Sequence, residues 1–251
     1  MNVNRKQIGN FNYGAGVFIE YSDNAIISNC EIINNVSENA AGLCIAWNTN
    51  VRLKGTTIRN NHAIIDNGGL GLYRNSTIVF DTLDLNSIYL NTAGEQGSDL
   101  GFSNNHHDVV LDTFTVADYD DYYLYAINEA TYTLRANHYA IEQESSDLYV
   151  SPSGNNSNAG LTADDPLQTI AYALLKIKAD STSPKTVHLA DGLYSSSLNN
   201  QRFPIKLKQY VGVVGESKEN TIIDCEYKYD LMRAWTYDKR MYGIKVKNLT
   251  C

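Results

Sequence analysis

The sequence predicts an all-β fold, a right-handed parallel β-helix, and three observations in its first half support this prediction. Apolar residues recur at a nearly constant interval, since Val17, Leu43, Leu70 and Leu100 lie 26, 27 and 30 residues apart, a period typical of a solenoid. Within each repeat the apolar positions are spaced by two, which is the period of a β-strand. The segments between them are rich in Asn, Asp, Ser and Gly, which favour turns.

Three short strands per repeat cannot bury an apolar face alone, whereas stacked repeats place like residues above like residues at about 4.8 Å per coil. The coil is expected to be right-handed, as parallel crossover connections are. Gly16, Gly42 and Gly69 recur before the first strand, where a corner is expected to need an unusual backbone conformation. The seven predicted columns are Val17, Leu43, Leu70, Leu100; Ile19, Ile45, Leu72, Phe102; Ala25, Val51, Ile78, Val109; Ile27, Leu53, Phe80, Leu111; Cys30, Thr56, Leu83, Phe114; Ile32, Ile58, Leu85, Val116; and Asn35, Asn61, Ile88, Tyr119.

The chain is predicted to contain two partial units. Residues 1–118 read as the C-terminal coils of one β-helix, and residues 119–147 as Tyr-rich closing strands or a linker. Residues 148–251 read as the N-terminal cap and first coils of a second β-helix. A helix is expected after Asp165 as N-cap and Pro166 at the first helical position. Its predicted apolar face consists of Leu167, Ile170, Ala171, Leu174 and Ile177.

Three motifs of the second unit carry a resemblance to a known family. They are Tyr-Val-Ser-Pro-Ser-Gly from Tyr149, Asp-Pro-Leu-Gln-Thr-Ile from Asp165, and His-Leu-Ala-Asp-Gly-Leu-Tyr from His188. In this order they resemble, over residues about 148–225, an uncharacterised bacterial domain family that opens pectin-lyase-like right-handed β-helices in secreted proteins. Residues 14–118 resemble the generic repeats of the same superfamily. The resemblance implies a helix that plugs the first coil, an extracellular or cell-surface location and a parent protein with several such units, but no enzyme mechanism.

Composition limits the classes of partner. The net charge is −8, and Lys and Arg are not clustered, which disfavours binding to nucleic acid or to an anionic membrane surface. No apolar run reaches the length of a transmembrane span. Because the chain enters a coil soon after Met1 without a signal peptide, and ends within an expected strand at Cys251, we expect it to be an internal piece of a longer protein.

The best catalytic candidates are Glu31, Asp84 and Arg59. The outward column Glu31, Thr57, Asp84 places the two carboxylates two coils apart, at about 9.6 Å, which is the upper limit for an inverting glycosidase. Arg59 would project from the coil between them. An exposed network of charged side chains is the alternative interpretation, because surface ion pairs are common.

Other residues are candidates for ligand or metal binding. Tyr123 and Tyr125 are candidates for stacking on sugar rings, with a tyrosine-faced edge sheet as the alternative. No metal site and no cofactor is predicted. Calcium binding is left open, because neither the cluster Asp118, Asp120, Asp121 nor the carboxylate-free loop 155–160 is a clear motif. His106-His107-Asp108 lacks a fourth ligand at a recognisable spacing, and His188 is interpreted as a packed or capping residue.

Three functions are compatible with these observations. The leading hypothesis is a non-catalytic secreted or cell-surface β-helix scaffold that binds a glycan or another surface along its long face. The alternative is a polysaccharide lyase or glycoside hydrolase. A passive structural stalk between modules of a longer chain is the third.

Overall fold

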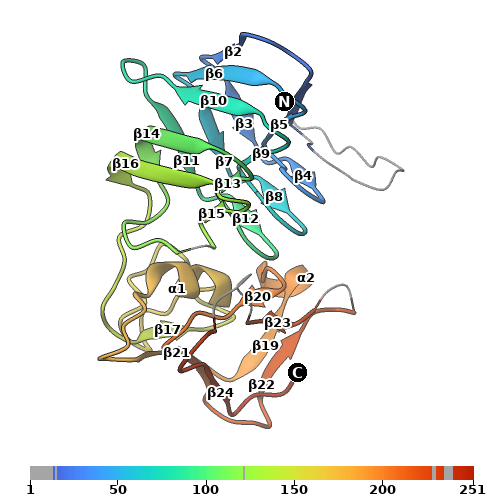
Figure 1. Cartoon of the computed structure of the whole chain (residues 1–251). Helices are drawn as coiled ribbons and strands as arrows, with labels where there is room; N and C mark the ends of the chain where they lie inside the picture. Colours follow the sequence, from blue (N-terminus) through green and yellow to red (C-terminus); the bar gives the residue numbers. More distant parts are fainter. Residues whose placement is uncertain (1–13, 15, 121, 228–229, 235–239) are drawn as a thin grey trace. The chain divides into compact units, whose positions relative to one another are not determined.

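A computed structural model describes residues 14, 16–120, 122–227, 230–234 and 240–251. Nearly all of its regular structure is parallel β, arranged as a solenoid of about eight turns, and this confirms the predicted parallel β-helix. The chain forms two compact units, which divide between Ala140 and Ile141 (Figure 1).

The first unit repeats up to four short strands per coil. The strands are β1 (Val17–Glu20), β2 (Ala25–Ser28), β3 (Glu31–Ile33), β4 (Val36–Ser37), β5 (Leu43–Ala46), β6 (Asn50–Lys54), β7 (Thr57–Arg59), β8 (His62–Ala63), β9 (Leu70–Leu72), β10 (Thr77–Phe80), β11 (Asn86–Tyr89), β12 (Thr92–Ala93), β13 (Leu100–Phe102), β14 (His106–Phe114), β15 (Leu124–Ala126) and β16 (Thr131–Tyr139). The Tyr-rich segment after residue 119 thus supplies β15 and β16, which pair with β13 and β14.

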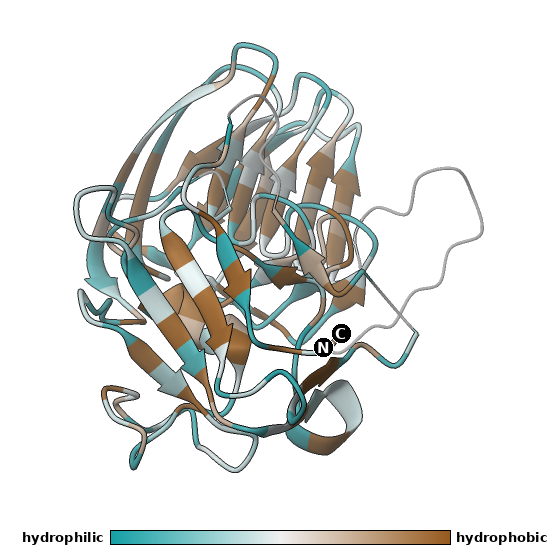
Figure 2. Ribbon diagram, turned by 90° about the horizontal axis from the view of Figure 1, so that it is seen from below, coloured by the Kyte–Doolittle hydropathy of each residue, from teal (hydrophilic) through white to brown (hydrophobic). Residues whose placement is uncertain are grey.

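Two long sheets run through the coils of this unit, in the orders β1-β5-β9-β13-β15 and β3-β7-β11-β14-β16. The first predicted column is confirmed, because Leu43 pairs with Val17 and with Leu70, and Leu70 pairs with Leu100. Apolar and polar residues alternate along many of the strands, as Figure 2 shows. The apolar side faces the inside of the coil, where fully buried Leu and Ile side chains form the core.

The predicted register is wrong from the third coil onward in columns five to seven. Thr56 lies beside Asn86 rather than Leu83, and Ile58 pairs with Ile88 rather than Leu85. The reason is a turn after β10 that is three residues longer than its counterpart after β6. Leu83 sits in this turn and is 91% exposed. The fourth coil shifts with it, so that Phe114 pairs with Ile88.

A buried ladder of amide side chains replaces the predicted seventh column. The side-chain Oδ1 of Asn61 accepts hydrogen bonds from the backbone and side-chain nitrogens of Asn35. Asn91 accepts from Asn61 in the same way, and the ladder ends where Asp99 Oδ1 accepts from Asn91. Each residue of this ladder is buried. Stacked amides of this kind satisfy polar groups at a corner that faces the core.

Glycine is required at position 42 because the backbone of the next coil lies very close to it. A left-handed backbone is not the reason, because Gly42 and its column neighbours Gly16 and Gly69 do not have a positive φ. A Cβ on Gly42 would lie 2.4 Å from the carbonyl oxygen of Gly69, which accepts the Leu43 N–H of the inter-coil ladder. We therefore expect Gly42→Ala to destabilise the first unit by about 1–3 kcal/mol, measured from the urea midpoint. The matched control is Gly212→Ala in the second unit, where the nearest atom would lie at 3.5 Å; an equal loss in both variants would contradict the steric explanation.

The second unit has a four-stranded parallel sheet, β17-β18-β21-β24, and two smaller pairs, β19-β22 and β20-β23. Its elements are β17 (Leu148–Val150), α1 (Ile170–Lys176), β18 (Lys185–Leu189), β19 (Gly192–Ser195), α2 (Ser196–Asn199), β20 (Ile205–Lys206), β21 (Val211–Gly215), β22 (Thr221–Asp224), β23 (Met232–Arg233) and β24 (Lys245–Lys247).

Helix α1 starts later than predicted. Its N-cap is Thr169, whose hydroxyl accepts from Tyr172 N, and Thr169 is itself held by the side chain of Asn156. Asp165 instead closes the preceding loop by accepting from Ala159 N. The predicted apolar face is otherwise buried, with Ala173 in the place expected for Ala171. The helix packs against β17, β18 and β20 and so covers the core of this unit.

Candidate functional site

Several residues of the recognised motifs hold the second unit together. The Tyr194 hydroxyl donates to the carbonyl oxygens of Val150 and Ala190. Gly192 lies against Pro152, so closely that a Cβ would be 2.7 Å from the proline ring. Asp191 accepts hydrogen bonds from Ser217 and other residues of the next coil. These residues therefore have structural roles, which separates them from two motif residues that face outward.

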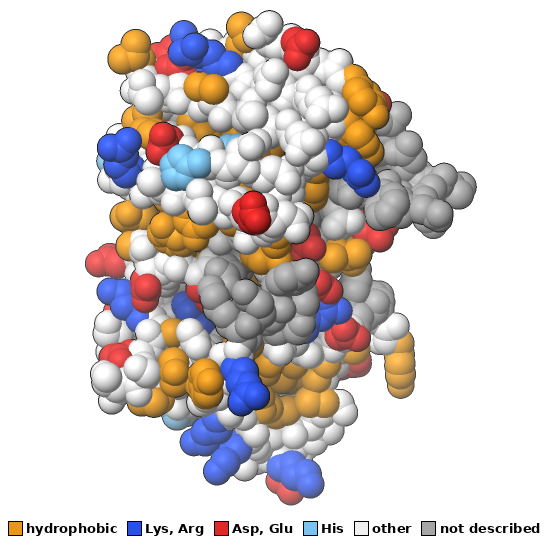
Figure 3. Space-filling view, viewed as in Figure 1, with side chains coloured by type: hydrophobic (Ala, Val, Ile, Leu, Met, Phe, Trp, Pro, Cys, Tyr) orange, Lys and Arg blue, Asp and Glu red, His pale blue; other side chains and the backbone are white. Residues whose placement is uncertain are grey.

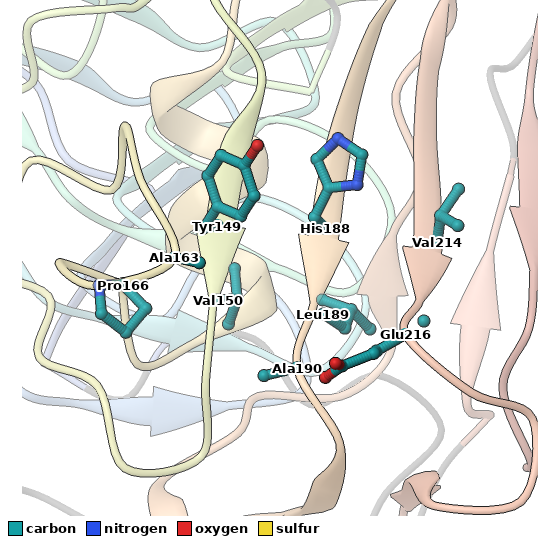
Figure 4. Close-up of a pocket in the computed structure, with 10 residues that line it drawn as sticks. Tyr149, Val150, Ala163, Pro166, His188, Leu189, Ala190, Val214 and Glu216 are labelled. Carbon is teal, nitrogen blue, oxygen red and sulfur yellow. The ribbon is translucent and has the colours of Figure 1, made fainter.

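The two outward residues are Tyr149 and His188. They are register partners on β17 and β18, and Val214 of β21 continues the same row. Figure 4 shows the three side chains side by side on neighbouring strands. The rings of Tyr149 and His188 are stacked, with centroids 5.0 Å apart and planes inclined by 22°.

The imidazole of His188 is oriented by Asp147. Its Nε2 lies 2.9 Å from Asp147 Oδ2, while Asp147 Oδ1 accepts from Thr186 N at 2.8 Å. Both side chains of the pair are partly exposed, at 39% for His188 and 43% for Asp147. The carboxylate is fixed by the backbone of β18, so the histidine ring has a defined orientation rather than a free surface position.

A cavity of about 280 Å³ extends from these rings across the ends of β17, β18 and β21. Ala163 and Pro166 line it beside Tyr149, and Glu216 lies at its other end (Figure 4). One carboxylate oxygen of Glu216 accepts from Asp191 N at 3.2 Å. We call this the Tyr149–His188 cleft. It combines an aromatic ring, an imidazole and a carboxylate with an apolar lining, which is the usual composition of a small-ligand site.

The predicted catalytic row is not formed. Glu31 pairs with Thr57, but the next residue of that row is Ser87, and Thr113 follows it. Asp84 lies in the longer turn before β11, where its carboxylate contacts Lys54 Nζ at 2.7 Å. Arg59 lies between Ile33 and Tyr89 in the register of its sheet. The two carboxylates are therefore not stacked two coils apart, as the sequence columns predicted.

The predicted binding tyrosines differ from each other. Tyr123 is only 2% exposed, so the prediction of an exposed ring is wrong for this residue. It packs edge-on against Tyr122, and burial raises its pKa well above the usual value. Tyr125 is half-buried in β15, opposite Gly101 of β13. Tyr123 lies before β15, in a turn where its backbone N–H donates to Asp120 O, so strand alternation does not set its orientation.

Neither predicted polar cluster gathers into a metal site in the described part of the chain, where no group of three or more His, Cys, Asp or Glu could hold an ion. Asp120 accepts from Tyr122 N in a tight turn, and Asp121 lies outside the described residues. His106 bonds to the Thr131 hydroxyl on the surface, whereas His107 stacks on Phe102 and is buried. Within the same residues, no helix is long and apolar enough to cross a membrane.

The fold and the motif geometry define a parallel β-solenoid protein. Residues 152–228 match the model of a family described as a protein of unknown function (DUF1565), which is associated with β-helix proteins. No curated protein matches the chain, and no solved structure matches it. The match covers the motifs around Pro152 and His188, and it leaves the finer assignment to the pectin-lyase-like superfamily as a prediction.

Proposed function

We propose that the protein is a secreted or cell-surface β-solenoid scaffold that binds glycan in the Tyr149–His188 cleft. The observation that carries this proposal is the stacked pair of Tyr149 and His188, held by Asp147 on a partly exposed sheet face. An aromatic ring offers apolar area to the C–H face of a sugar, and neighbouring carboxylate and imidazole groups can bond its hydroxyls. The location is inferred from the resemblance of the second unit to domains of secreted proteins.

The charge distribution supports a ligand of this kind over a polyanion. Positive and negative side chains are interspersed on the face of the molecule in Figure 3. The net charge of −8 adds a general repulsion toward nucleic acid. A glycan instead needs local stacking and hydrogen bonds, which the cleft supplies.

A second candidate function is a carbohydrate-active enzyme, a lyase or a hydrolase. The same cleft favours it, because His188 is oriented by a carboxylate and Glu216 lies in the same cavity. A hydrolase needs a positioned acid that protonates the glycosidic oxygen, and a lyase needs a positioned base that removes a proton from a ring carbon. The passive stalk is the third possibility, and it requires neither binding nor turnover.

The test is affinity electrophoresis of the whole chain through gels that contain soluble β-glucan, xylan, galactomannan, glycol chitin or polygalacturonate. We expect at least one polymer to retard the protein, and Tyr149→Ala to weaken binding about tenfold, since loss of one stacked ring is worth about 0.5–1.5 kcal/mol. Tyr242→Ala is the matched control, because Tyr242 is a tyrosine of the same unit that is 55% exposed and lies outside the cleft.

The outcomes separate the three functions. Release of reducing ends or of unsaturated products, lost in Glu216→Gln, would favour the enzyme. Retardation that depends on Tyr149 without turnover would support the scaffold. No retardation by any polymer would contradict glycan binding and leave the stalk as the better explanation.

A further inference from the structure

A second cluster of aromatic side chains lies on the outside of the first unit. Trp47 packs edge-on against Phe18, with ring centroids 5.9 Å apart, and stacks on Tyr21 at 6.1 Å with an interplanar angle of 26°. The guanidinium carbon of Arg74 lies 5.4 Å from the centroid of the Trp47 ring. These four residues follow or belong to successive strands of one sheet. We call them the aromatic corner.

The aromatic corner is only partly explained by packing. Phe18 and Trp47 cover a small buried cluster that includes Cys44. Tyr21, in contrast, is 70% exposed, and Arg74 is exposed as well. Among the residues that the structure describes, Arg74 has no ion-pair partner within 4.0 Å. Core burial therefore accounts for part of the cluster and leaves an aromatic ring and a cation at the surface.

The backbone of the aromatic corner is also strained. Tyr21, Trp47 and Arg74 have φ values of 48°, 52° and 53°. This left-handed region is unfavourable for bulky side chains, and most other non-glycine residues with positive φ in this unit are asparagines. Asparagine would form the same turn at lower cost. Strain that is kept at an exposed aromatic position is a reason to look for a function.

A row of polar side chains runs beside the aromatic corner, two or three residues further along each coil. Asn50 donates to Asp23 Oδ1 at 3.3 Å and accepts from the Thr77 hydroxyl. Asp23 and Asn50 are exposed. Aromatic surface next to a row of carboxylate, amide and hydroxyl groups matches the two sides of a sugar ring, which has an apolar C–H face and a hydroxyl edge.

We propose that the aromatic corner is a second saccharide-binding site, in which a sugar ring packs on Tyr21 and its hydroxyl groups bond to Asp23 and Asn50. Trp47 supports the Tyr21 ring from the next coil, and Arg74 fixes Trp47 by a cation–π contact. The proposal shares its ligand class with the proposed function, but it uses other residues in the other unit. Each site can therefore fail without the other.

The experiment uses the fluorescence of Trp47 in the full chain. The sequence has two tryptophans, so Trp235→Phe leaves Trp47 as the only one. Cello-, xylo-, manno- and chito-oligosaccharides are titrated into this variant. We expect a saturable change in Trp47 emission with at least one of them. Because Tyr21→Ala alters the surroundings of Trp47 directly, binding to that variant is measured by calorimetry. The measurement is made in the Tyr149→Ala background, so that the Tyr149–His188 cleft does not contribute. There the dissociation constant should rise about tenfold in Tyr21→Ala, while Tyr21→Phe should retain binding.

The control for independence is Tyr149→Ala, which should leave the Trp47 response unchanged. If no oligosaccharide changes Trp47 emission, or if Tyr21→Ala leaves calorimetric binding unchanged in the Tyr149→Ala background, the second site does not exist. If Tyr149→Ala alone removes all binding, the aromatic corner proposal fails and the Tyr149–His188 cleft stands. If Tyr21→Ala alone removes it, the reverse holds.

Discussion

The first unit is expected to lose stability as the pH rises from about 4 to about 7, and Asp99→Asn is expected to remove this loss. Asp99 is fully buried at the end of the amide ladder. Its Oδ1 accepts two hydrogen bonds from Asn91, but Oδ2 has no partner within the described residues. Burial raises the pKa of Asp99 to about 7, against the lowering effects of the Thr115 hydroxyl and of Asn91.

The direction of this pH dependence follows from the linkage between proton binding and folding. The pKa of Asp99 is 3.8 without burial and about 7 in the folded unit, so folding favours the protonated carboxyl. Its stabilising effect is complete below pH 4, decreases as the pH rises toward 7 and is lost above that value. A shift of this size corresponds to at most about 4 kcal/mol. In Asp99→Asn the amide oxygen can still accept from Asn91, and no proton is exchanged.

Other titratable groups in this unit change its stability with pH in the opposite direction. The chain with Asp99 must therefore be compared with Asp99→Asn at each pH. The pKa values of Asp81 and Asp108 are lowered, by backbone and hydroxyl hydrogen bonds respectively, and their contribution is lost as the pH falls. Burial lowers the pKa of His107, which likewise favours higher pH. Tyr123, buried near Asp99, has a raised pKa and stays neutral over this range.

The measurement is urea unfolding followed by Trp47 emission at pH 4 to 8, in the Trp235→Phe background with and without Asp99→Asn. We expect the difference in unfolding free energy between the two proteins to change by several kcal/mol across this range, in favour of Asp99→Asn at high pH. If the unfolding free energies of the two proteins change with pH in parallel, Asp99 does not ionise in the folded unit between these pH values.

The sequence predicted the β-helix because a two-residue apolar period persists through the chain. Leu43 and Leu70 fall in the correct column, because the turn that is three residues longer follows β10 and so lies after both residues. The later columns failed because the longer turn around Leu83 contains apolar residues at strand-like spacing. An alignment that matches hydrophobicity places Leu83 in the core, whereas the polar Asn86 and Asn91 occupy the buried positions. Buried amides that bond to one another are invisible to a hydrophobic pattern.

The candidate site was missed for a related reason. Alternation along β17 and β18 could have placed Tyr149 and His188 on the outer face, because Val150 and Leu189 point inward. The contact between His188 and Asp147, in contrast, joins residues 41 positions apart and depends on the register of two strands. The late start of α1 also depends on tertiary contacts, since the capping residue is selected by the Asn156 side chain. Local capping preference alone favoured Asp165.

Asn61→Ala is expected to be the most destabilising substitution in the amide ladder. The Asn61 side chain accepts from the backbone and side-chain nitrogens of Asn35 and donates to Ile32 O and Asn91 Oδ1 at 2.9 Å each. Removing it leaves buried donors and acceptors on both adjacent coils without partners. Each such group costs about 1–3 kcal/mol, and we expect a total loss of about 3–5 kcal/mol.

The matched control is Asn50→Ala in the same coil, because the Asn50 side chain is exposed and, among the residues that the structure describes, bonds to Asp23 and Thr77 alone. That change should stay within about 0.5 kcal/mol. Both values come from urea unfolding of the first unit followed by Trp47 emission. Similar small losses in the two variants would mean that water replaces the Asn61 amide and that the apolar columns alone hold the coils together. A large loss confined to Asn61→Ala would show that the buried amides fix the register of the solenoid.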